Sequence, residues 1–378
     1  MISDYDFDFL SELYALDAPD AWLLAEYPSS NSNQTRFQNP VKYIIHDPFP
    51  PPRRELLKVL GPHHLMCCWG NQLSATSEVE PPPMLLDHWA RVFGDEARPD
   101  WQSFDDDASY ITAFPHESIP AAQQVVDPDT NYSIHSKEVI EKIDCPQADV
   151  LPEVRSPCVV KLSHGYAGLG NFFVRNEHDE ALMRKQLAEQ WPDARLVVNS
   201  VIEDITGDFG VQFYLRRSGE IVWLGFTEQN FDANARWCGG IFTASLEDQM
   251  RPYFRPFIEA AGTYLHSVGY FGVVGIDILR DMADRLYLVD VNPRLTGISP
   301  FLMASRLFVR QGTTTGIYRA SCRFAGPLEE LIVAAESRTD ARVVVLSAFE
   351  DGDECVCHLS VSSDSPHKNE AVFDSLVQ

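Results

Sequence analysis

Two short apolar runs separated by a polar turn constrain the fold more than any other part of the sequence. Residues 275–279 (Gly-Ile-Asp-Ile-Leu) and 286–291 (Leu-Tyr-Leu-Val-Asp-Val) are rich in β-branched and large apolar residues, which favour strands. If the turn closes around residues 283 and 284, Asp277 lies opposite Asp290. Side chains alternate between the two faces of a strand. We therefore expect one face of the second strand to carry Leu286, Leu288, Asp290 and Asn292, and the other to carry Tyr287, Val289 and Val291.

The two facing aspartates indicate a cation site. Two carboxylates held side by side repel unless a proton or a cation lies between them, and an unpaired Asp on an otherwise apolar strand is costly. Oxygen ligands of this kind suit Mg²⁺, which commonly takes one or two carboxylates together with substrate phosphates. Arg294, just beyond the second strand, adds a fixed positive charge. The alternative is a sheet edge with solvated acids.

The charge balance argues against some classes of partner. The chain has 378 residues with 55 acidic against 30 basic side chains, a net charge of −25. This charge argues against a nucleic acid bound through a broad basic face and against an anionic membrane surface. A nucleotide substrate would instead need its charge met locally, by a metal ion and a few Lys or Arg side chains.

The cysteines and the N-terminal residues favour a cytoplasmic protein. The eight cysteines form no Cys-x-x-Cys pair and no spacing that fits a zinc site, so we expect reduced thiols. The first 20 residues lack the basic and apolar regions of a signal peptide. No run of about 18 apolar residues, as a membrane-spanning helix would need, occurs in the chain. We expect no membrane partner, and a homodimer as the default assembly.

A glycine-rich loop lies between two further predicted strands, residues 158–162 and 172–174. Its glycines are Gly165, Gly168 and Gly170. Glycines between two strands predict a hairpin, unlike the strand-to-helix turn of a dinucleotide-binding fold. Small residues allow backbone N–H groups to approach phosphate oxygens closely, and Lys161 could reach a phosphate from the first strand. An ordinary flexible hairpin loop is the alternative.

The remaining pattern predicts a chain of mixed helices and strands. Helix signals occur at residues 56–60, 136–143, 180–190, 254–268, 301–309 and 328–336. Strand signals occur at residues 64–69, 195–202, 211–215, 221–226, 343–347 and 355–361. We expect residues 227–240 to form a long polar loop and the polar tail from Ser362 to be mobile.

The order of these features resembles the ATP-grasp superfamily. The most specific match is residues 290–294 (Asp-Val-Asn-Pro-Arg), which resemble the Glu-x-Asn-x-Arg strand of that family, with Asp where Glu is usual. The resemblance covers about residues 131–310. It implies an α+β, or α/β, ATP-grasp fold with two subdomains that grip ATP. The implied units are a pre-ATP-grasp domain (1–130), an ATP-grasp domain (131–310) with a nucleotide-gripping part (150–226) and a metal-binding part (250–310), and a C-terminal extension (311–378).

The resemblance also implies a role for individual residues. Lys137 and Lys161 would contact ATP phosphates. The loop that closes over the phosphates would include His164, Gly165, Gly168 and Gly170. The backbone at Ser200, Val201 and Ile202 would meet the adenine edge, and Asp208 or Glu203 would hold the ribose hydroxyls. Asp277, Asp290 and Asn292 would bind Mg²⁺ or Mn²⁺.

The implied reaction is ATP-dependent ligation of a small carboxylic acid to an amine, with amino acids or peptides as the expected substrates. Arg294 and Lys161 would act on the reacting groups, and Glu228 is the candidate general base. Three alternatives stay open on the same nucleotide site. They are a carboxylate–thiol ligase, a small-molecule kinase and a non-catalytic nucleotide-binding protein.

Overall fold

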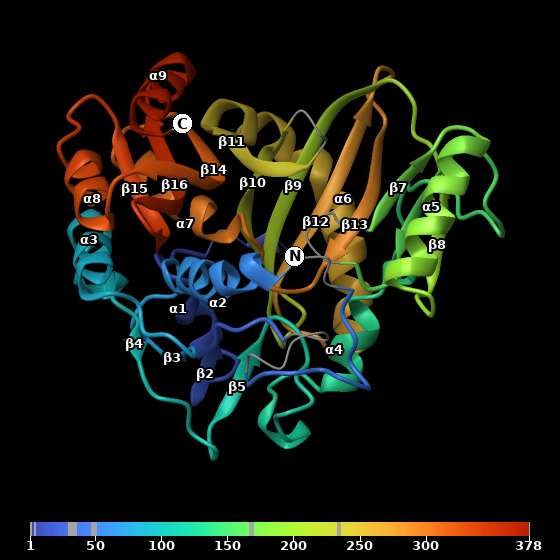
Figure 1. Cartoon of the computed structure of the whole chain (residues 1–378), viewed down its shortest axis with the longest axis horizontal. Coiled ribbons are helices and arrows are strands. Elements are labelled where there is room, and N and C mark those ends of the chain that lie inside the picture. Colours follow the sequence, from blue (N-terminus) through green and yellow to red (C-terminus); the bar gives the residue numbers. More distant parts are fainter. Residues whose placement is uncertain are drawn as a thin grey trace.

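The computed structural model describes residues 2–3, 5–28, 36–46, 51–165, 170–232 and 236–377, without the side chains of residues 51–57. Within these ranges the strands form three sheets (Figure 1). The largest sheet contains β1 (Ile2–Ser3), β9 (Ile205–Leu215), β10 (Ile221–Phe231), β11 (Trp237–Thr243), β12 (Gly272–Asp281), β13 (Leu286–Asn292), β14 (Thr315–Ala325), β15 (Arg342–Asp351) and β16 (Glu354–Ser363). Its order is β13-β12-β9-β10-β11-β14-β16-β15, with β1 beside β10.

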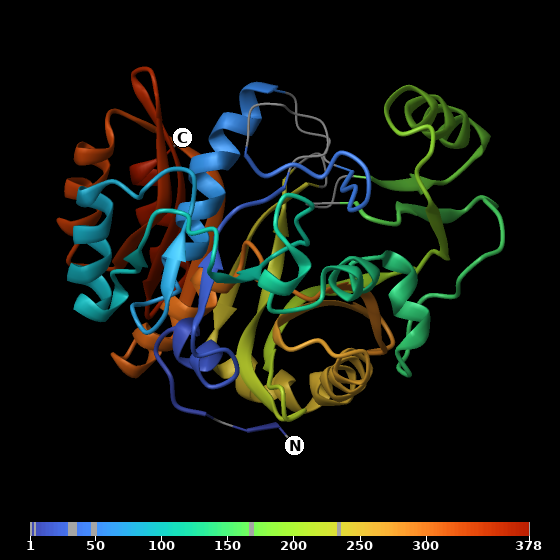
Figure 2. The same cartoon turned by 90° about the horizontal axis from the view of Figure 1, so that it is seen from below.

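The two smaller sheets differ in strand direction. The parallel sheet of the N-terminal region has the order β4-β3-β2-β5, and the antiparallel sheet has the order β7-β6-β8. Their strands are β2 (Ala21–Leu24), β3 (Ser74–Thr76), β4 (Asp100–Trp101), β5 (Ser109–Thr112), β6 (Cys158–Leu162), β7 (Asn171–Val174) and β8 (Leu196–Ser200). The antiparallel sheet and α5 (Glu177–Gln190) form a lobe that stands apart from the main sheet (Figure 2).

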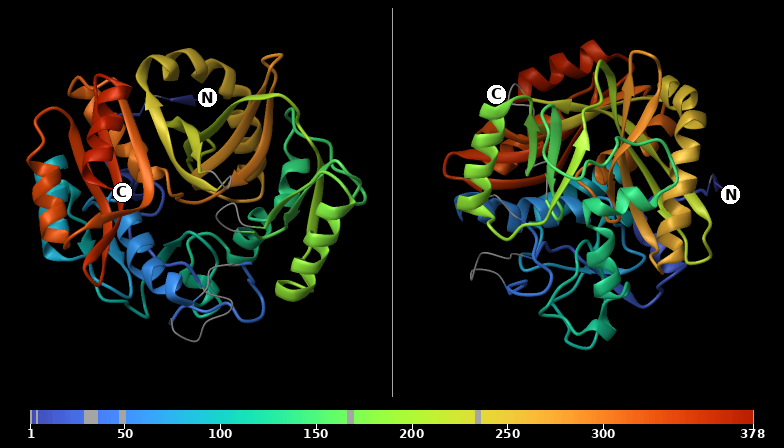
Figure 3. Two further views of the ribbon diagram at one scale, coloured as in Figure 1. Left: turned by 45° about the horizontal axis from the view of Figure 1, so that its top comes forward. Right: turned by 90° about the vertical axis from the view of Figure 1, so that its right-hand side faces the viewer.

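Helices cover the sheets and connect them. They are α1 (Leu10–Ala15), α2 (Pro51–Met66), α3 (Pro83–Phe93), α4 (Pro128–Ile134), α6 (Ala244–Ser267), α7 (Ser299–Arg310), α8 (Leu328–Glu336) and α9 (Pro366–Leu376). Short 3₁₀ turns occur at η1 (Asp95–Ala97), η2 (Ala121–Gln123) and η3 (Lys137–Lys142). Figure 3 shows the N-terminal sheet, the lobe and the main sheet arranged around a common centre.

The long helix α6 determines which face of the main sheet is core. Its apolar residues recur at helical spacing, as the sequence predicts. Four of them are completely buried: Phe254, Ile258, Ala261 and Leu265. They pack in one cluster with β-strand residues that share one face of β9, β10 and β12, including Phe213, Val274 and Ile276. The opposite face of these strands is therefore available for polar side chains.

The hairpin of β12 and β13 confirms one part of the strand prediction and corrects another. Asp277 lies opposite Asp290, as expected. However, Ile278 pairs with Leu288, so Val289 is an extra residue that bulges out of the ladder. Leu288 and Val291 are therefore both in the α6 core, and Leu286 packs against it. The prediction that Leu286 and Leu288 share the face of Asp290 and Asn292 is wrong because the bulge reverses the alternation.

Three other expectations are also wrong. Residues 64–66 end the helix α2 and do not begin a strand, because a short apolar run fits either element. The expected loop at 227–240 is largely strand, with β10 extending to Phe231 and β11 beginning at Trp237. The expected mobile tail contains the end of β16 and the helix α9, whose Val372 and Phe373 are buried.

Among the helices of the described ranges, none combines the length and the apolar character that a membrane span requires.

Glu26, at the carboxyl end of β2, provides a test of the N-terminal packing. The side chain is 2% exposed, and Oε1 accepts a hydrogen bond from the Glu78 N–H at 2.6 Å. Burial raises the pKa of Glu26 to about 8. A carboxyl whose folded-state pKa is raised stabilises the fold below its unfolded pKa, and this contribution is lost as the pH rises through the folded value.

We therefore expect the unfolding free energy of the wild type to fall, relative to Glu26→Gln, by up to about 1.4 kcal/mol per pH unit between about pH 5 and 8. Urea unfolding at several pH values measures this difference. Parallel pH profiles for the two proteins would contradict a buried, protonated Glu26.

Candidate active site

The facing aspartates of β12 and β13 lie among polar groups from four separate segments. Lys137 Nζ lies 2.6 Å from both carboxylate oxygens of Asp290. The amide of Asn292 donates to Asp290 at 3.3 Å, and Arg294 donates to Asn292 Oδ1 at 3.0 Å. Asp277 instead accepts a hydrogen bond from Gln229 Nε2 at 2.9 Å. The structure thus brings Lys137, Asp277, Asp290, Asn292 and Arg294 together.

The pKa values of the two carboxyl groups shift in opposite directions. Burial raises the pKa of Asp277 to about 7, and the negative charges of Asp290 and Asp208 act in the same direction. Burial opposes ionisation of Asp290 as well, but the positive charges of Lys137 and Lys161 outweigh it and lower the pKa of Asp290. The pair therefore carries one charge that Lys137 compensates, together with one carboxyl that tends to keep its proton.

This donor set fits a hard divalent cation better than a soft one. Within the described residues, no group of three or more His, Cys, Asp or Glu side chains could form a complete metal site. Two carboxylates and one amide oxygen are nevertheless a sufficient protein contribution for Mg²⁺, which keeps water and substrate phosphates as its other ligands. A cation between Asp277 and Asp290 would take the place of the proton that their repulsion now requires.

Lys161 connects the lobe to the main sheet. Its Nζ donates to the carbonyl oxygen of Val289 at 2.6 Å, and Val289 is the bulged residue of β13. Burial lowers the pKa of Lys161. The bulge reverses the side-chain alternation of β13, and it also leaves the Val289 carbonyl outside the ladder. This carbonyl accepts the hydrogen bond from Lys161 of the lobe.

An exposed aromatic residue lies on the same face of the lobe as Lys161. Phe173 pairs with Val159 across the β6–β7 ladder, two residues from Lys161, so the three side chains share one face. Phe173 is 62% exposed, whereas the other face of this sheet packs on α5. Sequence reasoning did not single out Phe173, although the register of the glycine hairpin contained the signal.

The ends of the glycine loop are fixed against the N-terminal region. His164 stacks on Tyr132 with ring centroids 3.9 Å apart, and its Nε2 lies 3.1 Å from the Tyr132 carbonyl oxygen. Gly165 pairs with His46, and Gly170 adopts a φ of 93°, which favours glycine. Gly168 lies outside the described residues.

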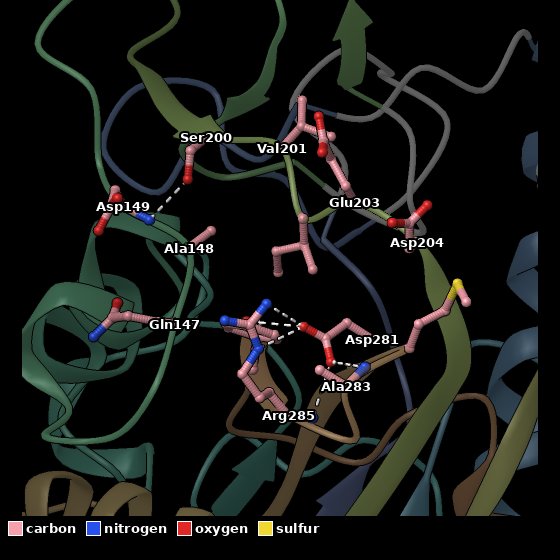
Figure 4. A pocket seen from close by; sticks show the side chains of 13 residues that line it. Gln147, Ala148, Asp149, Ser200, Val201, Glu203, Asp204, Asp281, Ala283 and Arg285 are labelled. Atoms are coloured by element: carbon pink, nitrogen blue, oxygen red, sulfur yellow. Dashed lines mark hydrogen bonds and ion pairs between the residues drawn. The ribbon is translucent and has the colours of Figure 1, made fainter.

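A pocket of about 470 Å³ lies at the connection between the lobe and the main sheet (Figure 4). On one side it is lined by the last residue of β8, Ser200, and by the linker that follows, which includes Val201, Ile202 and Glu203. On the other side lies the β12–β13 turn, where Arg285 pairs with Asp281 at 2.7 Å. The full lining is Gln147, Ala148, Asp149, Ser200, Val201, Ile202, Glu203, Asp204, Asp281, Met282, Ala283, Arg285 and Tyr287. Lys161, Asp277 and Asp290 are not part of this lining.

Asp208 and Glu228 lie on opposite faces of the main sheet. Gly210 pairs with Asp277, so Asp208 shares the face of Asp277 two residues further along β9. Burial raises the pKa of Asp208 to about 6. Glu228 pairs with Phe209, a residue of the α6 core, and therefore projects away from Asp277. The structure does not bring Glu228 to the site, and its neighbour Gln229 contacts Asp277 instead.

The N-terminal sheet contributes the surroundings of Arg294. The guanidinium carbon of Arg294 lies 5.0 Å from the ring centre of Phe114, just beyond β5. The same ring contacts His135 at 4.7 Å between centroids. Sequence reasoning missed Phe114, His135 and Gln229. Only His135 carried a local signal, because it lies two residues before Lys137.

Comparison with known proteins identifies the central part of the chain. Residues 135–292 match the family described as L-aspartate–L-methionine ligase, ATP grasp. A curated relative, the butirosin acyl-carrier protein–L-glutamate ligase of Niallia circulans, is 25% identical over 216 residues. The match covers 50% of this chain and 49% of the relative, so this chain spans about half the length of that protein.

Solved structures share the fold over a larger part of the chain. The N5-carboxyaminoimidazole synthetase of Staphylococcus aureus with ADP has a TM-score of 0.52 and 12% identity, covering 83% of this chain and 93% of that one. The biotin carboxylase domain of Hydrogenobacter thermophilus 2-oxoglutarate carboxylase with MgADP has a TM-score of 0.50 and 14% identity, covering 81% and 74%. At such identities the likeness concerns the fold alone. Residues 135–292 thus match an ATP-grasp family model, and the chain shares its fold with these solved structures over about four fifths of its length.

Proposed function

We propose that this protein is an ATP-dependent ligase that activates a carboxylic acid as an acyl phosphate, couples it to an amine and releases ADP and phosphate. The observation that carries the proposal is the half-buried, hydrogen-bonded cluster of Lys137, Asp277, Asp290, Asn292 and Arg294. The names of the matched family and of the curated relative are those of amino-acid ligases. They support an amino acid as one of the two substrates.

The phosphate end of the nucleotide would lie at the two aspartates. Asp277, Asp290 and Asn292 would hold Mg²⁺ or Mn²⁺, which when bound would neutralise phosphate oxygens during transfer. Asp277 would lose its proton on binding, because a cation then compensates its charge. Lys137, freed from its role as the partner of Asp290, would turn its three N–H groups toward the phosphates.

The nucleoside end would lie in the pocket beside the lobe. The backbone of Ser200, Val201 and Ile202 lines that pocket and would meet the adenine edge. Asp208, or Glu203, would accept hydrogen bonds from the ribose hydroxyls. Lys161 would bridge the two ends, and the backbone at Gly165 and Gly170 would close over the phosphates.

The chemistry would occur beside Arg294. A carboxylate oxygen of the acid attacks the γ-phosphorus and ADP leaves, which converts a poor acyl donor into an acyl phosphate with a good leaving group. The amine then attacks the acyl carbon, and the charge that develops on the acyl oxygen faces Arg294. Arg294 is oriented for this role by its hydrogen bond to Asn292 Oδ1.

A phosphate-release screen tests the reaction class. Purified protein is incubated with ATP, Mg²⁺ and amino acids, singly and in pairs, and products are identified by mass spectrometry. We expect ADP and phosphate to form in stoichiometry with an amide product when acid and amine are both present. AMP and pyrophosphate as products would contradict an acyl-phosphate mechanism and indicate adenylation.

Asp290→Asn tests the metal site with the shape of the side chain preserved. We expect turnover to fall by at least about 100-fold, because the variant cannot compensate a divalent cation. The matched control is Asp284→Asn, an exposed position on the same hairpin, where the positive φ of 59° suits asparagine. Turnover and thermal unfolding are measured for both, and normal turnover of a folded Asp290→Asn protein would exclude the metal role.

Lys161→Met tests the phosphate contact. The substitution keeps an unbranched side chain but removes the charge and the hydrogen bond to Val289. We expect the dissociation constant for ATP, measured by calorimetry with Mg²⁺ present, to rise by about 10- to 100-fold. The control is Lys185→Met, an exposed lysine on α5 of the same lobe. Wild-type ATP affinity in the Lys161 variant would contradict the assignment.

A further inference from the structure

The side chain of Gln229 holds one of the two oxygens of Asp277, the proposed metal ligand on β12. Its Nε2 donates a hydrogen bond to Asp277 Oδ1 at 2.9 Å. An ionised carboxylate can only accept hydrogen bonds, so the amide must present its N–H to Asp277. The second oxygen, Oδ2, has no hydrogen-bond partner within the described part of the chain, and it is not a fully buried atom. Among these residues, Asp277 therefore presents one engaged oxygen and one open oxygen.

The main sheet leaves a path for this contact. Gln229 lies on β10 and Asp277 on β12, with β9 between them. Gly210 of β9 pairs with Asp277 on one side and, on the other, with Thr227, two residues before Gln229. A Cβ atom at Gly210 would lie 3.4 Å from Gln229 Nε2, 3.6 Å from its Cδ and 3.7 Å from its Cγ. The glutamine side chain therefore lies against the backbone of β9, in space that a larger residue at position 210 would occupy.

The other carboxylate of the pair is engaged at both oxygens. Asp290 Oδ1 accepts a hydrogen bond from the Val291 N–H at 2.9 Å, and Oδ2 accepts one from the Asn292 amide at 3.3 Å. Lys137 contacts both oxygens as well. The pair therefore offers a cation few open oxygen positions, namely Oδ2 of Asp277 and the lone pairs of Asp290 that Lys137 now contacts.

We propose that Gln229 is a positioning residue that makes the site selective for a small cation, by limiting Asp277 to one oxygen. This inference rests on the ligase function proposed above. Ca²⁺ takes about six to eight oxygen ligands and accepts both oxygens of a carboxylate, whereas Mg²⁺ demands a nearly ideal octahedron and keeps several waters. A site with few protein oxygens therefore favours Mg²⁺. Without the Gln229 donor, Oδ1 becomes available and the site suits Ca²⁺ better.

Two substitutions test this selectivity. Gln229→Met keeps the length of the side chain and removes the hydrogen-bond donor. Gln229→Glu keeps the shape, removes the donor and adds carboxylate oxygens beside Asp277. Each protein, in excess over ADP, is loaded with Mn²⁺, and bound Mn²⁺ is followed by electron paramagnetic resonance while Mg²⁺ or Ca²⁺ is added. The readout is the ratio of the Ca²⁺ and Mg²⁺ displacement constants, which does not depend on turnover.

We expect Gln229→Met to shift this ratio in favour of Ca²⁺ by at least about tenfold, because groups that hold metal ligands tune metal affinity by such factors. Gln229→Glu should shift the ratio in the same direction. Gln186→Met, at an exposed glutamine of α5, is the control and should leave the ratio unchanged. Thermal unfolding is measured for each protein, because a glutamine that only stabilised the sheet would change the melting temperature and not the ratio.

Three results would overturn the inference. They are an unchanged ratio in the folded Gln229 variants, a shift in favour of Mg²⁺, and an equal loss of affinity for both cations. If Gln229→Met does not fold, the ratio in Gln229→Glu decides. A wild type that binds no Mn²⁺, or an Asp277→Asn protein that binds it as tightly as the wild type, would contradict the metal site of the proposed function, which is a separate outcome.

Discussion

The repulsion between the carboxylates of Asp277 and Asp290 determines which charged groups can lie beside them. Two half-buried carboxylates that face each other on neighbouring strands repel unless a positive charge or a proton compensates them. Lys137 compensates the charge of Asp290, while burial and the charges of Asp290 and Asp208 raise the pKa of Asp277 to about 7. A divalent cation held by the pair would compensate both carboxylates and leave Lys137 available to another anionic group.

Three parts of the fold converge on this pair. The main sheet supplies the carboxylates on the face opposite α6, and the lobe supplies Lys161, which contacts Val289. The N-terminal sheet supplies Phe114, which supports both Arg294 and His135. The C-terminal strands β14, β15 and β16 belong to the same main sheet as the strands that carry the carboxylates, at its opposite end from β13.

The sequence predicted the parts of the site that depend on local pattern. The pairing of Asp277 with Asp290, the glycine hairpin after Lys161 and the amphipathic helix α6 all follow from spacing within a short segment. The superfamily followed from the order of these local features. The β-bulge at Val289 did not, because a single inserted residue changes the alternation without changing the composition of the strand.

Contacts between distant segments were not readable. His135 and Arg294 contact the same Phe114 ring, and Gln229 reaches Asp277 across the intervening strand β9. Neither contact can be predicted from spacing along the chain. Residues 227–231 read as a loop because they are polar, yet they form a strand whose backbone pairs on both sides. The C-terminal tail is polar overall, but α9 packs on the core through apolar side chains that include the buried Val372 and Phe373.

The hydrogen bond from Lys161 to Val289 joins the lobe to the main sheet at one point. A single backbone carbonyl is a poor substitute for the hydration of an ammonium group, and burial lowers the pKa of this lysine. A triphosphate beside Lys161 would supply the counter-ion that the carbonyl cannot. The nucleotide would thereby strengthen the contact between the two sheets that hold it.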